Sequence, residues 1–337
     1  MVEIGNALIG FTFSLCPVTD HVVGIDLGGS QVRALLSQLS GEPVVDAAAP
    51  TATGGAPAVV AQISDLALRV ALDAGVEWSR VASLAVGVPG VVSAGAGGAL
   101  SLAPNLPPFH ELDLAARLGA DLAVPVVVDN DVNVATLAEQ HHGHGVGVAN
   151  FVFIAVGTGV GMGIVSSGVV QRGAHGAAGE IGYLPVGADP FDPAHHAHGP
   201  LEEAAGGVGI VRRYAARTGA RGLTLAASDI AHRAERGDAD ADAVVSEQAR
   251  ALALAVVSII SVLDPALVVF GGGIGSRRQV VARVEAEFSR LTRRTIPLRI
   301  SKLGERAGLI GATELARAHA HAERVLGMDG VPGSIRP

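Results

Sequence analysis

Short apolar runs of strand length alternate along the chain with longer segments in which apolar residues recur at helical spacing. Strands are predicted at 21–27, 32–39, 43–50, 81–87, 124–129, 151–156, 161–167, 266–270 and 296–302. Helices are predicted at 56–75, 111–118, from Asp131 onward, and at 201–217, 227–236, 240–263, 277–292 and 305–326. This alternation predicts an α/β protein. Three strands precede the first helix and a glycine turn again follows a strand later, so we expect two similar lobes with a cleft between them.

Residues 1–20 fit this pattern poorly. The run 7–16 is apolar, but it is short, Glu3 precedes it without any positive charge, and no small-residue cleavage site follows, so a secretory signal is not expected. The segment could be an extra strand or the remnant of a segment present in longer relatives. No stretch approaches an uncharged transmembrane helix, so we expect no membrane partner.

Composition and charge narrow the class of protein. The 337 residues carry a net charge near −8 and only 3% aromatic residues, and the sole lysine is Lys302, which together argue against a nucleic-acid-binding surface. Lys302 lies in neither a P-loop nor a setting for a pyridoxal Schiff base. The single Cys16 excludes a disulfide framework and a cysteine zinc cluster, and it predicts a reducing, cytoplasmic location.

Three glycine turns follow predicted strands. In the first, Gly28 and Gly29 let backbone amides approach a phosphate, Ser30 adds a hydroxyl donor, and Asp26 can hold a hydrated Mg²⁺. A plain hairpin would explain this first turn equally well. The second turn, at 157–163, has four alternating glycines, which close approach by a ligand explains better than folding does. The third, at 271–275, lies between a strand and a helix, where a nucleotide can bind.

In this order, the three turns resemble the actin-like ATPase (ribonuclease H-like) fold of sugar kinases, and the chain more closely resembles the ROK family. The motifs that carry this resemblance are Asp26–Ser30, Gly87–Gly90, Ala103–Pro107, Asp129–Asn133, Gly157–Gly159, Gly176–Gly182, Leu263–Pro265 and Gly308–Ala312. They cover about residues 21–315. The family contains bacterial hexose kinases and sugar-responsive transcriptional repressors, so the fold alone does not decide the function.

The resemblance implies a division into domains. It consists of an extension at 1–20, a small α/β domain at 21–130, a large α/β domain at 131–304, a helix at 305–326 that returns to the small domain, and a tail at 327–337. A homodimer or higher homo-oligomer is also implied.

Asp131 follows a buried strand and begins a helix, where an aspartate is often only an N-cap. By resemblance it is the catalytic base, which accepts the proton of a sugar hydroxyl as that oxygen attacks the γ-phosphoryl group of ATP. The implied sugar-binding residues are Asn105, Asn130, Asp131, Glu180, Tyr183 and Glu202. The implied nucleotide-binding residues are Asp26, Gly28, Gly29, Ser30, Gly157, Thr158, Gly159, Gly272 and Gly273, with Asp26 holding Mg²⁺ through water.

The chain departs from the family at its structural zinc site, which needs one His and three Cys. Tyr183 stands at the His position, and Pro193, His195 and Pro200 stand at the Cys positions. We therefore expect no structural zinc. The histidines in two clusters could still hold a metal, although solvated loop histidines are the simpler interpretation; they are His195, His196 and His198, and His141, His142 and His144.

These observations favour an ATP-dependent, glucokinase-like hexose kinase. The alternative is the sugar-sensing core of a ROK transcriptional regulator without its DNA-binding helix-turn-helix, which Tyr183 and residues 1–20 would fit. A carbohydrate-binding protein that uses no ATP is a third reading. We expect Gly159→Val to remove nucleotide affinity while sugar affinity stays intact, which would count against that third reading.

Overall fold

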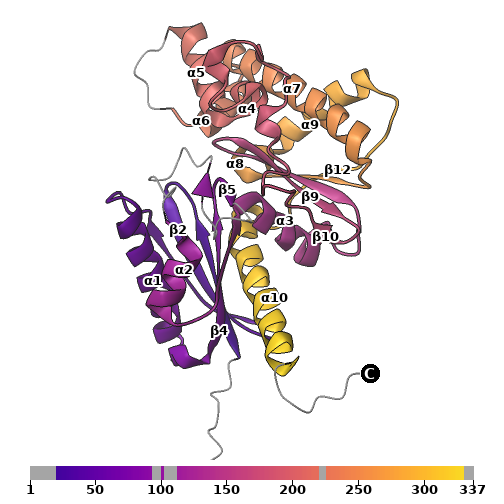
Figure 1. Ribbon diagram of the computed structural model, residues 1–337. Helices are drawn as coiled ribbons and strands as arrows, with labels where there is room; N and C mark the ends of the chain where they lie inside the picture. The colour runs from indigo at the N-terminus through magenta and orange to yellow at the C-terminus, as the bar shows by residue number, and fades with distance from the viewer. Residues whose placement is uncertain (1–19, 93–99, 102–111, 220–224, 330–337) are drawn as a thin grey trace, which may run out of the picture.

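The computed structural model describes residues 20–92, 100–101, 112–219 and 225–329. The chain forms two five-stranded sheets, one in each of two lobes (Figure 1). Their orders are β3-β2-β1-β4-β7 and β10-β9-β8-β11-β12. In each sheet the first three strands are antiparallel and the last three are parallel, sharing the central strand. The repeated topology confirms the prediction of two similar lobes.

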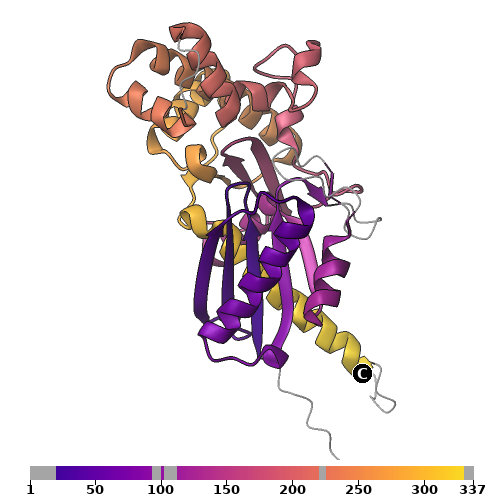
Figure 2. The same ribbon diagram turned by 90° about the vertical axis from the view of Figure 1, so that its left-hand side faces the viewer.

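The first sheet is covered by helices on both faces. Its strands are β1 (His21–Leu27), β2 (Gln31–Gln38), β3 (Pro43–Pro50), β4 (Val81–Val88) and β7 (Val126–Asn130). Helices α1 (Ala56–Asp73) and α2 (Leu114–Leu122) cover one face, and α10 (Ala307–Asp329) crosses the other (Figure 2). The short η1 (Trp78–Arg80), β5 (Val91–Val92) and β6 (Leu100–Ser101) lie in the connections.

Alternation along β1 assigns its side chains to the two faces. Val23, Ile25 and Leu27 enter the core beneath α1, whereas Val22 faces α10. Gly24 also faces α10, where a Cβ would lie only 2.5 Å from the backbone nitrogen of Thr313. The close contact at Gly24 brings α10 against the sheet, and the same face carries Asp26.

More helices accompany the second sheet than the first. Its strands are β8 (Phe151–Val156), β9 (Val160–Ser166), β10 (Val169–Val170), β11 (Val268–Gly271) and β12 (Leu298–Ile300). The helices in this half of the chain are α3 (Asp131–His142), which precedes the sheet, and α4 (Pro200–Ala205), α5 (Gly207–Thr218), α6 (Ala227–Glu235), α7 (Ala239–Leu263), α8 (Gly272–Gly275) and α9 (Arg278–Leu291). Short 3₁₀ turns are η2 (Ile181–Tyr183), η3 (Pro193–His195) and η4 (Gly304–Arg306).

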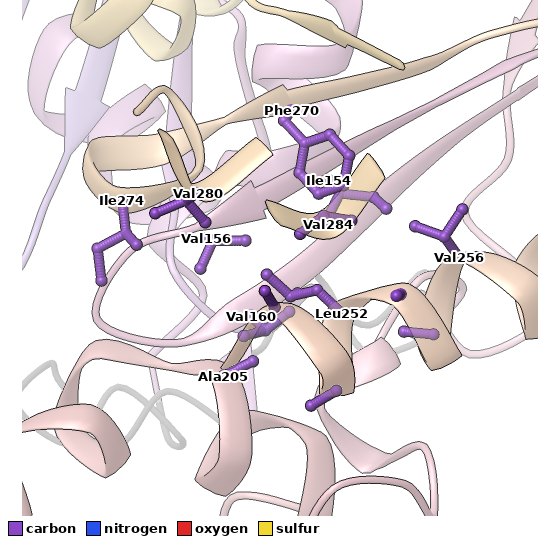
Figure 3. Packing of buried hydrophobic residues seen from close by; sticks show 14 of the residues in the cluster. Ile154, Val156, Val160, Ala205, Leu252, Val256, Phe270, Ile274, Val280 and Val284 are labelled. Atoms are coloured by element: carbon purple, nitrogen blue, oxygen red, sulfur yellow. The ribbon is translucent and has the colours of Figure 1, made fainter. Parts of the chain in front are cut away.

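Strand β8 separates two cores in the second lobe. Ile154 and Val156 pack with Phe270 of β11 and Leu252 of α7 (Figure 3). Phe151 and Phe153, which alternate with them, face α3 on the opposite side. Because α3 and α10 also pack on each other, these two helices join the second lobe to the first.

Several predicted boundaries were wrong. The helix predicted at 201–217 is two helices, α4 and α5, separated at Gly206, where a Cβ would lie 2.7 Å from the carbonyl oxygen of Glu202. The helix predicted at 111–118 is α2, which begins after Asp113 because that carboxylate caps the amide of Ala116. The strand predicted at 296–302 is reduced to β12.

Helix α7 is long and apolar enough to cross a membrane, which the sequence analysis did not anticipate. It packs against α4, α5, α6 and α9, and most of its apolar window is buried inside the protein. Its apolar composition therefore fits the central helix of a protein core.

Candidate active site

The carboxyl ends of three parallel strands bring acidic side chains to one edge of the first sheet. Asp26 of β1 is paired in register with Gly87 of β4, and Gly87 with Asp129 of β7. Gly87 lets α3 pack closely against this edge, since a Cβ there would already be in contact with Val134 of α3 at 3.4 Å. Ligands in α/β folds bind at such strand ends.

Asp131 is the first residue of α3, and its neighbour Asn130 performs the capping. The side-chain oxygen of Asn130 accepts hydrogen bonds from the amides of Val132 and Asn133, at 2.9 and 3.1 Å. Its side-chain nitrogen donates to the carbonyl of Gly90 at 2.9 Å. The interpretation of Asp131 as the N-cap is thus wrong. Both polar atoms of the Asn130 side chain already make hydrogen bonds within the chain.

The half-buried carboxyl of Asp131 lies among other acids. Burial, together with the nearby charges of Asp26 and Glu180, raises its pKa to about 7, even though the hydrogen bond that it accepts from the amide of Val132 at 2.9 Å lowers the pKa. Burial also raises the pKa of Asp26, although the guanidinium of Arg33, 3.6 Å away, partly opposes this rise. A carboxylate with a pKa near neutrality, held in a group of acids, is suited to accept a proton.

Two glycines position Glu180 near Asp131. Gly176 and Gly179 both have positive φ angles, and a Cβ on either would overlap a backbone carbonyl, of Val92 in β5 and of Met162 in β9 respectively. The amide of Met162 donates to Gly179 at 2.9 Å. The glycines of this motif therefore serve to press the segment before Glu180 against two strands.

Glu202 of α4 stands beside Glu180 and beneath the second glycine turn. Its carboxylate accepts a hydrogen bond from the amide of Val160 at 2.9 Å. Burial raises the pKa of both Glu180 and Glu202, and the charge of Glu202 raises that of Glu180 further, whereas His198, 3.5 Å away, lowers that of Glu202. Two neighbouring carboxylates of this kind can accept hydrogen bonds from vicinal sugar hydroxyls.

Tyr183 is in the same group. Its hydroxyl donates to the carbonyl oxygen of Ala197 at 3.0 Å, and the residue is 40% exposed. Burial, together with the charges of Glu180 and Glu202, raises the pKa of its hydroxyl. The side chain thus joins the acidic group to the loop that follows it.

The second and third glycine turns lie together. The carbonyl oxygens of Gly157 and Thr158 accept hydrogen bonds from the first amides of α5, at 2.9 and 3.4 Å. The third turn forms α8, in which Gly272 has a φ of +79° and approaches the carbonyl of Val156, the residue before Gly157. The break between α4 and α5 therefore allows a helix start to support the second turn.

No contact or backbone angle within the described part of the protein requires glycine at positions 157 and 273. Neither has a positive φ, and a Cβ built on either meets no atom within 4 Å. Gly159 differs, because a Cβ there would overlap the carboxylate of Glu202. Open space next to two glycines, on turns that already lie together, fits a ligand that approaches the backbone closely.

The first turn is more exposed. Gly29 and Ser30 are exposed, while the amide of Gly28 donates to the carbonyl of Gln31 at 2.9 Å and its carbonyl accepts from the hydroxyl of Thr51 at 2.7 Å. Asn105, the remaining predicted site residue, lies outside the described residues. The structure thus brings Asp26, Asn130, Asp131, Glu180, Tyr183 and Glu202 together around the start of α3 and α4.

In the described part of the chain, no group of three or more His, Cys, Asp or Glu side chains could hold a metal ion. The histidines considered as ligands contact other partners: His142 pairs with Glu314 at 2.6 Å, His144 contacts the carbonyl of Ile300 at 3.1 Å, and His195 that of Asp189 at 2.8 Å. The prediction that these histidines lie in loops was wrong for His141 and His142, which belong to the last turn of α3.

The sequence analysis missed one pair of residues. Asp129 is buried, and its Oδ2 accepts hydrogen bonds from Nε and Nη2 of Arg172, at 2.8 and 2.6 Å. Asp129 stood in a quoted motif without an assigned role, and Arg172 follows β10 with no motif of its own. Asp129 also accepts a hydrogen bond from the side-chain amide of Asn133 at 3.2 Å, but no local sequence signal links it to Arg172.

With this geometry established, comparison with known proteins decides the family. The sequence matches the ROK family over residues 22–319. The chain belongs to the ROK family. The predicted family and the actin-like ATPase fold are thereby confirmed.

Within the ROK family, similar proteins include enzymes and a regulator. A glucokinase of Halalkalibacterium halodurans is 29% identical over 88% of this chain and 94% of that protein. A ROK family glucokinase from Streptomyces griseus, solved with glucose and AMPPNP, is 26% identical with a TM-score of 0.75, covering 88% of this chain and 99% of that one. A ROK family transcriptional regulator, a homologue of the E. coli MLC protein, is 25% identical with a TM-score of 0.78, covering 92% and 81%.

Proposed function

We propose that this protein is an ATP-dependent hexose kinase of the glucokinase type. The observation that carries the proposal is Asp131, whose pKa is raised to about 7 among Asp26 and Glu180, next to glycine turns with open space at Gly157 and Gly273. A proton-accepting carboxylate beside a nucleotide site is the arrangement that phosphoryl transfer to a hydroxyl requires. The similarity to glucokinases supports the same conclusion.

In this proposal each side chain has a defined task. Glu180, Glu202, Asn130 and Tyr183 bind and orient the sugar, and Asp131 accepts the proton of the attacking hydroxyl as the new O–P bond forms and the bond to ADP breaks. The amides of the first turn, at Gly28, Gly29 and Ser30, and of the second, at Gly157, Thr158 and Gly159, hold the phosphates. Gly272 and Gly273 of α8 face the adenosine.

Asp26 would hold Mg²⁺ through water. Its carboxylate is the kind of oxygen ligand that this cation prefers. The carboxylate is half-buried beside one guanidinium, that of Arg33, and burial raises its pKa, so a bound cation would stabilise its ionised form. When bound, the ion neutralises phosphate charge. ATP use implies a cytoplasmic location, and we propose the domain boundaries at 130/131 and 304/305 and the homo-oligomeric state as stated from the sequence.

The second candidate is a regulator core that binds sugar without phosphorylating it. Tyr183 in place of the zinc-ordered His favours it, and a ROK regulator is among the similar structures. The test measures ADP release with Mg-ATP across hexoses and N-acetylhexosamines, for the intact chain and Asp131→Ala. Turnover that the variant loses supports the kinase. Calorimetric sugar binding without turnover overturns it in favour of the regulator.

A further inference from the structure

The ion pair between Arg172 and Asp129 joins the two lobes directly at the site. Asp129 is the penultimate residue of β7 in the first sheet, two residues before Asp131. Arg172 follows β10 of the second sheet and begins the segment that leads to Glu180. The sugar-binding carboxylate and the base therefore lie on two different segments, and this pair connects those segments.

Asp129 is held on both of its oxygens. Oδ2 accepts both guanidinium hydrogen bonds, at 2.6 and 2.8 Å, while Oδ1 accepts from the amide of Asn130 at 2.8 Å and from the side chain of Asn133 at 3.2 Å. Asn130 and Asn133 belong to the first turn of α3 or its cap. The orientation of Asp129 is thus fixed by the same residues that place Asp131.

At its other end, Arg172 is part of the loop that carries Glu180. Its carbonyl oxygen accepts a hydrogen bond from the amide of Ala178 at 3.1 Å, which closes the loop two residues before Glu180. Gly173 follows Arg172 with a φ of +75°, and a Cβ built on it would lie only 3.1 Å from the Cβ of Ala178, so the turn is tight at this point. A shift of the guanidinium is therefore transmitted to Glu180 through a short, closed turn.

We propose that Arg172 is a positioning residue, which through Asp129 holds Glu180 at a fixed distance from Asp131 and so determines how the sugar is oriented toward its base. This inference rests on the proposed function. A side chain held by a charged pair of two short hydrogen bonds is oriented more firmly than one held by a neutral contact. Small displacements of a sugar hydroxyl from its base are costly for catalysis.

The test compares Arg172→Met, Arg172→Lys and Asp129→Asn with the intact chain. The matched control is Arg117→Met, because Arg117 also donates to an aspartate, Asp121, at 2.8 Å, but on the exposed face of α2. We expect Arg172→Met and Asp129→Asn each to raise the KM for hexose by about tenfold or more, with the KM for ATP within about twofold of normal. Arg172→Lys should recover part of the loss, and Arg117→Met should change neither constant.

Combining the two changes separates positioning from general stability. Because both residues act through one contact, the double variant Arg172→Met/Asp129→Asn should lose no more hexose affinity than the worse single variant. Equal losses for hexose and ATP, additive losses, or an unchanged KM for hexose would each overturn the inference. If Arg172→Met does not fold, Arg172→Lys and Asp129→Asn decide by the same criteria.

Calorimetry keeps this inference separate from the proposed function. If the intact chain binds hexose without phosphorylating it, the kinase proposal fails, and the dissociation constants for hexose and for a non-hydrolysable ATP analogue replace the two KM values. A loss confined to hexose then still supports Arg172 as a positioning residue. A chain that binds no hexose overturns both proposals.

Discussion

A side-chain carbon on Gly159 would overlap the carboxylate of Glu202, so the turn assigned to phosphates and the acid assigned to sugar are in direct contact. Glu202 is further tied to this turn by the amide of Val160, at 2.9 Å. The expectation that Gly159→Val would spare sugar affinity therefore no longer follows from the structure. The substitution should disturb both ligands.

Gly157→Val is the cleaner probe of nucleotide binding. Its Cβ meets open space and its backbone needs no positive φ, so the fold should tolerate it. We expect the dissociation constant for a non-hydrolysable ATP analogue to rise by about tenfold or more, with hexose affinity and Tm unchanged. Calorimetry measures both affinities, and Gly159→Ala, which should weaken both, is the comparison. Unchanged nucleotide affinity in Gly157→Val would contradict the assignment of this turn.

The pKa of Asp131 predicts the pH dependence of the rate. The base must be ionised to accept a proton, so kcat/KM for hexose should rise with pH through about 7, the pKa of the free protein. Rates measured between pH 5 and 9 give the profile, and Asp131→Asn should lack this rise along with most of the activity. A rise that is complete below pH 5 would show that Asp131 is not the group that limits the rate.

The same rise in pKa means that the ionised form of Asp131 destabilises the folded protein. Its pKa rises from 3.8 in the unfolded chain to about 7, so the folded protein binds more protons between these values, and the free energy of unfolding falls as pH rises through that window. Asp131→Asn, which keeps the shape, should stabilise the protein at pH 8 by at most about 4 kcal/mol, and progressively less toward pH 4.

Urea unfolding at several pH values checks this effect, with Asp121→Asn on α2 as the exposed control. A stability difference between Asp131→Asn and the intact chain that does not change with pH would contradict the shifted pKa.

Contacts within the loop after Tyr183 predict that the site keeps its shape without zinc. The hydroxyl of Tyr183 donates to Ala197 at 3.0 Å, and the amide of Gly199 to the carbonyl of His195 at 2.7 Å. A zinc-selective chelator, added with Mg²⁺ in excess, should leave the rate unchanged. Tyr183→Phe should raise the KM for hexose severalfold, because one hydrogen bond contributes about 1 kcal/mol. Stoichiometric zinc by elemental analysis, with activity lost on chelation, would refute the prediction.

Gly24 tests the contact between α10 and the first sheet. A Cβ there lies 2.5 Å from the nitrogen of Thr313, so Gly24→Ala must push α10 away from β1, and we expect a loss of about 3 kcal/mol in unfolding free energy. Gly273→Ala is the control, since its Cβ meets nothing within 4 Å. Urea denaturation of both variants gives the comparison. Equal stability of the two variants would mean that α10 does not pack as closely as described.

Local patterns were sufficient to predict the longer strands and the glycine turns, but not the two-residue strands β5, β6 and β10. Alternation of apolar residues along β1, and the glycines that end β8 and β11, express constraints that act over a few neighbouring residues. The position of Asp131 at a helix start was predictable for the same reason, although Asn130 proved to be the cap. The sequence alone could assign these elements but not how the two lobes meet.

Tertiary contacts account for what was missed. The break at Gly206 interrupts a segment of continuous helical period, and it arises because the start of α5 supports the carbonyls of Gly157 and Thr158. The pair of Arg172 with Asp129 joins residues 43 positions apart in two different sheets. Neither has a local sequence signal, since each depends on how distant segments are packed.

Helix α10 is the last helix described in the sequence, and its first turn lies at the site. A Cβ on Gly308, in its first turn, would lie 2.8 Å from Oδ1 of Asp26, so this helix forms the floor under the acid proposed to hold Mg²⁺. During synthesis β1 emerges from the ribosome nearly three hundred residues before α10 can pack against it. The nascent protein therefore contains almost every residue of its site before the site exists, and the capacity for phosphoryl transfer should arise only when α10 docks.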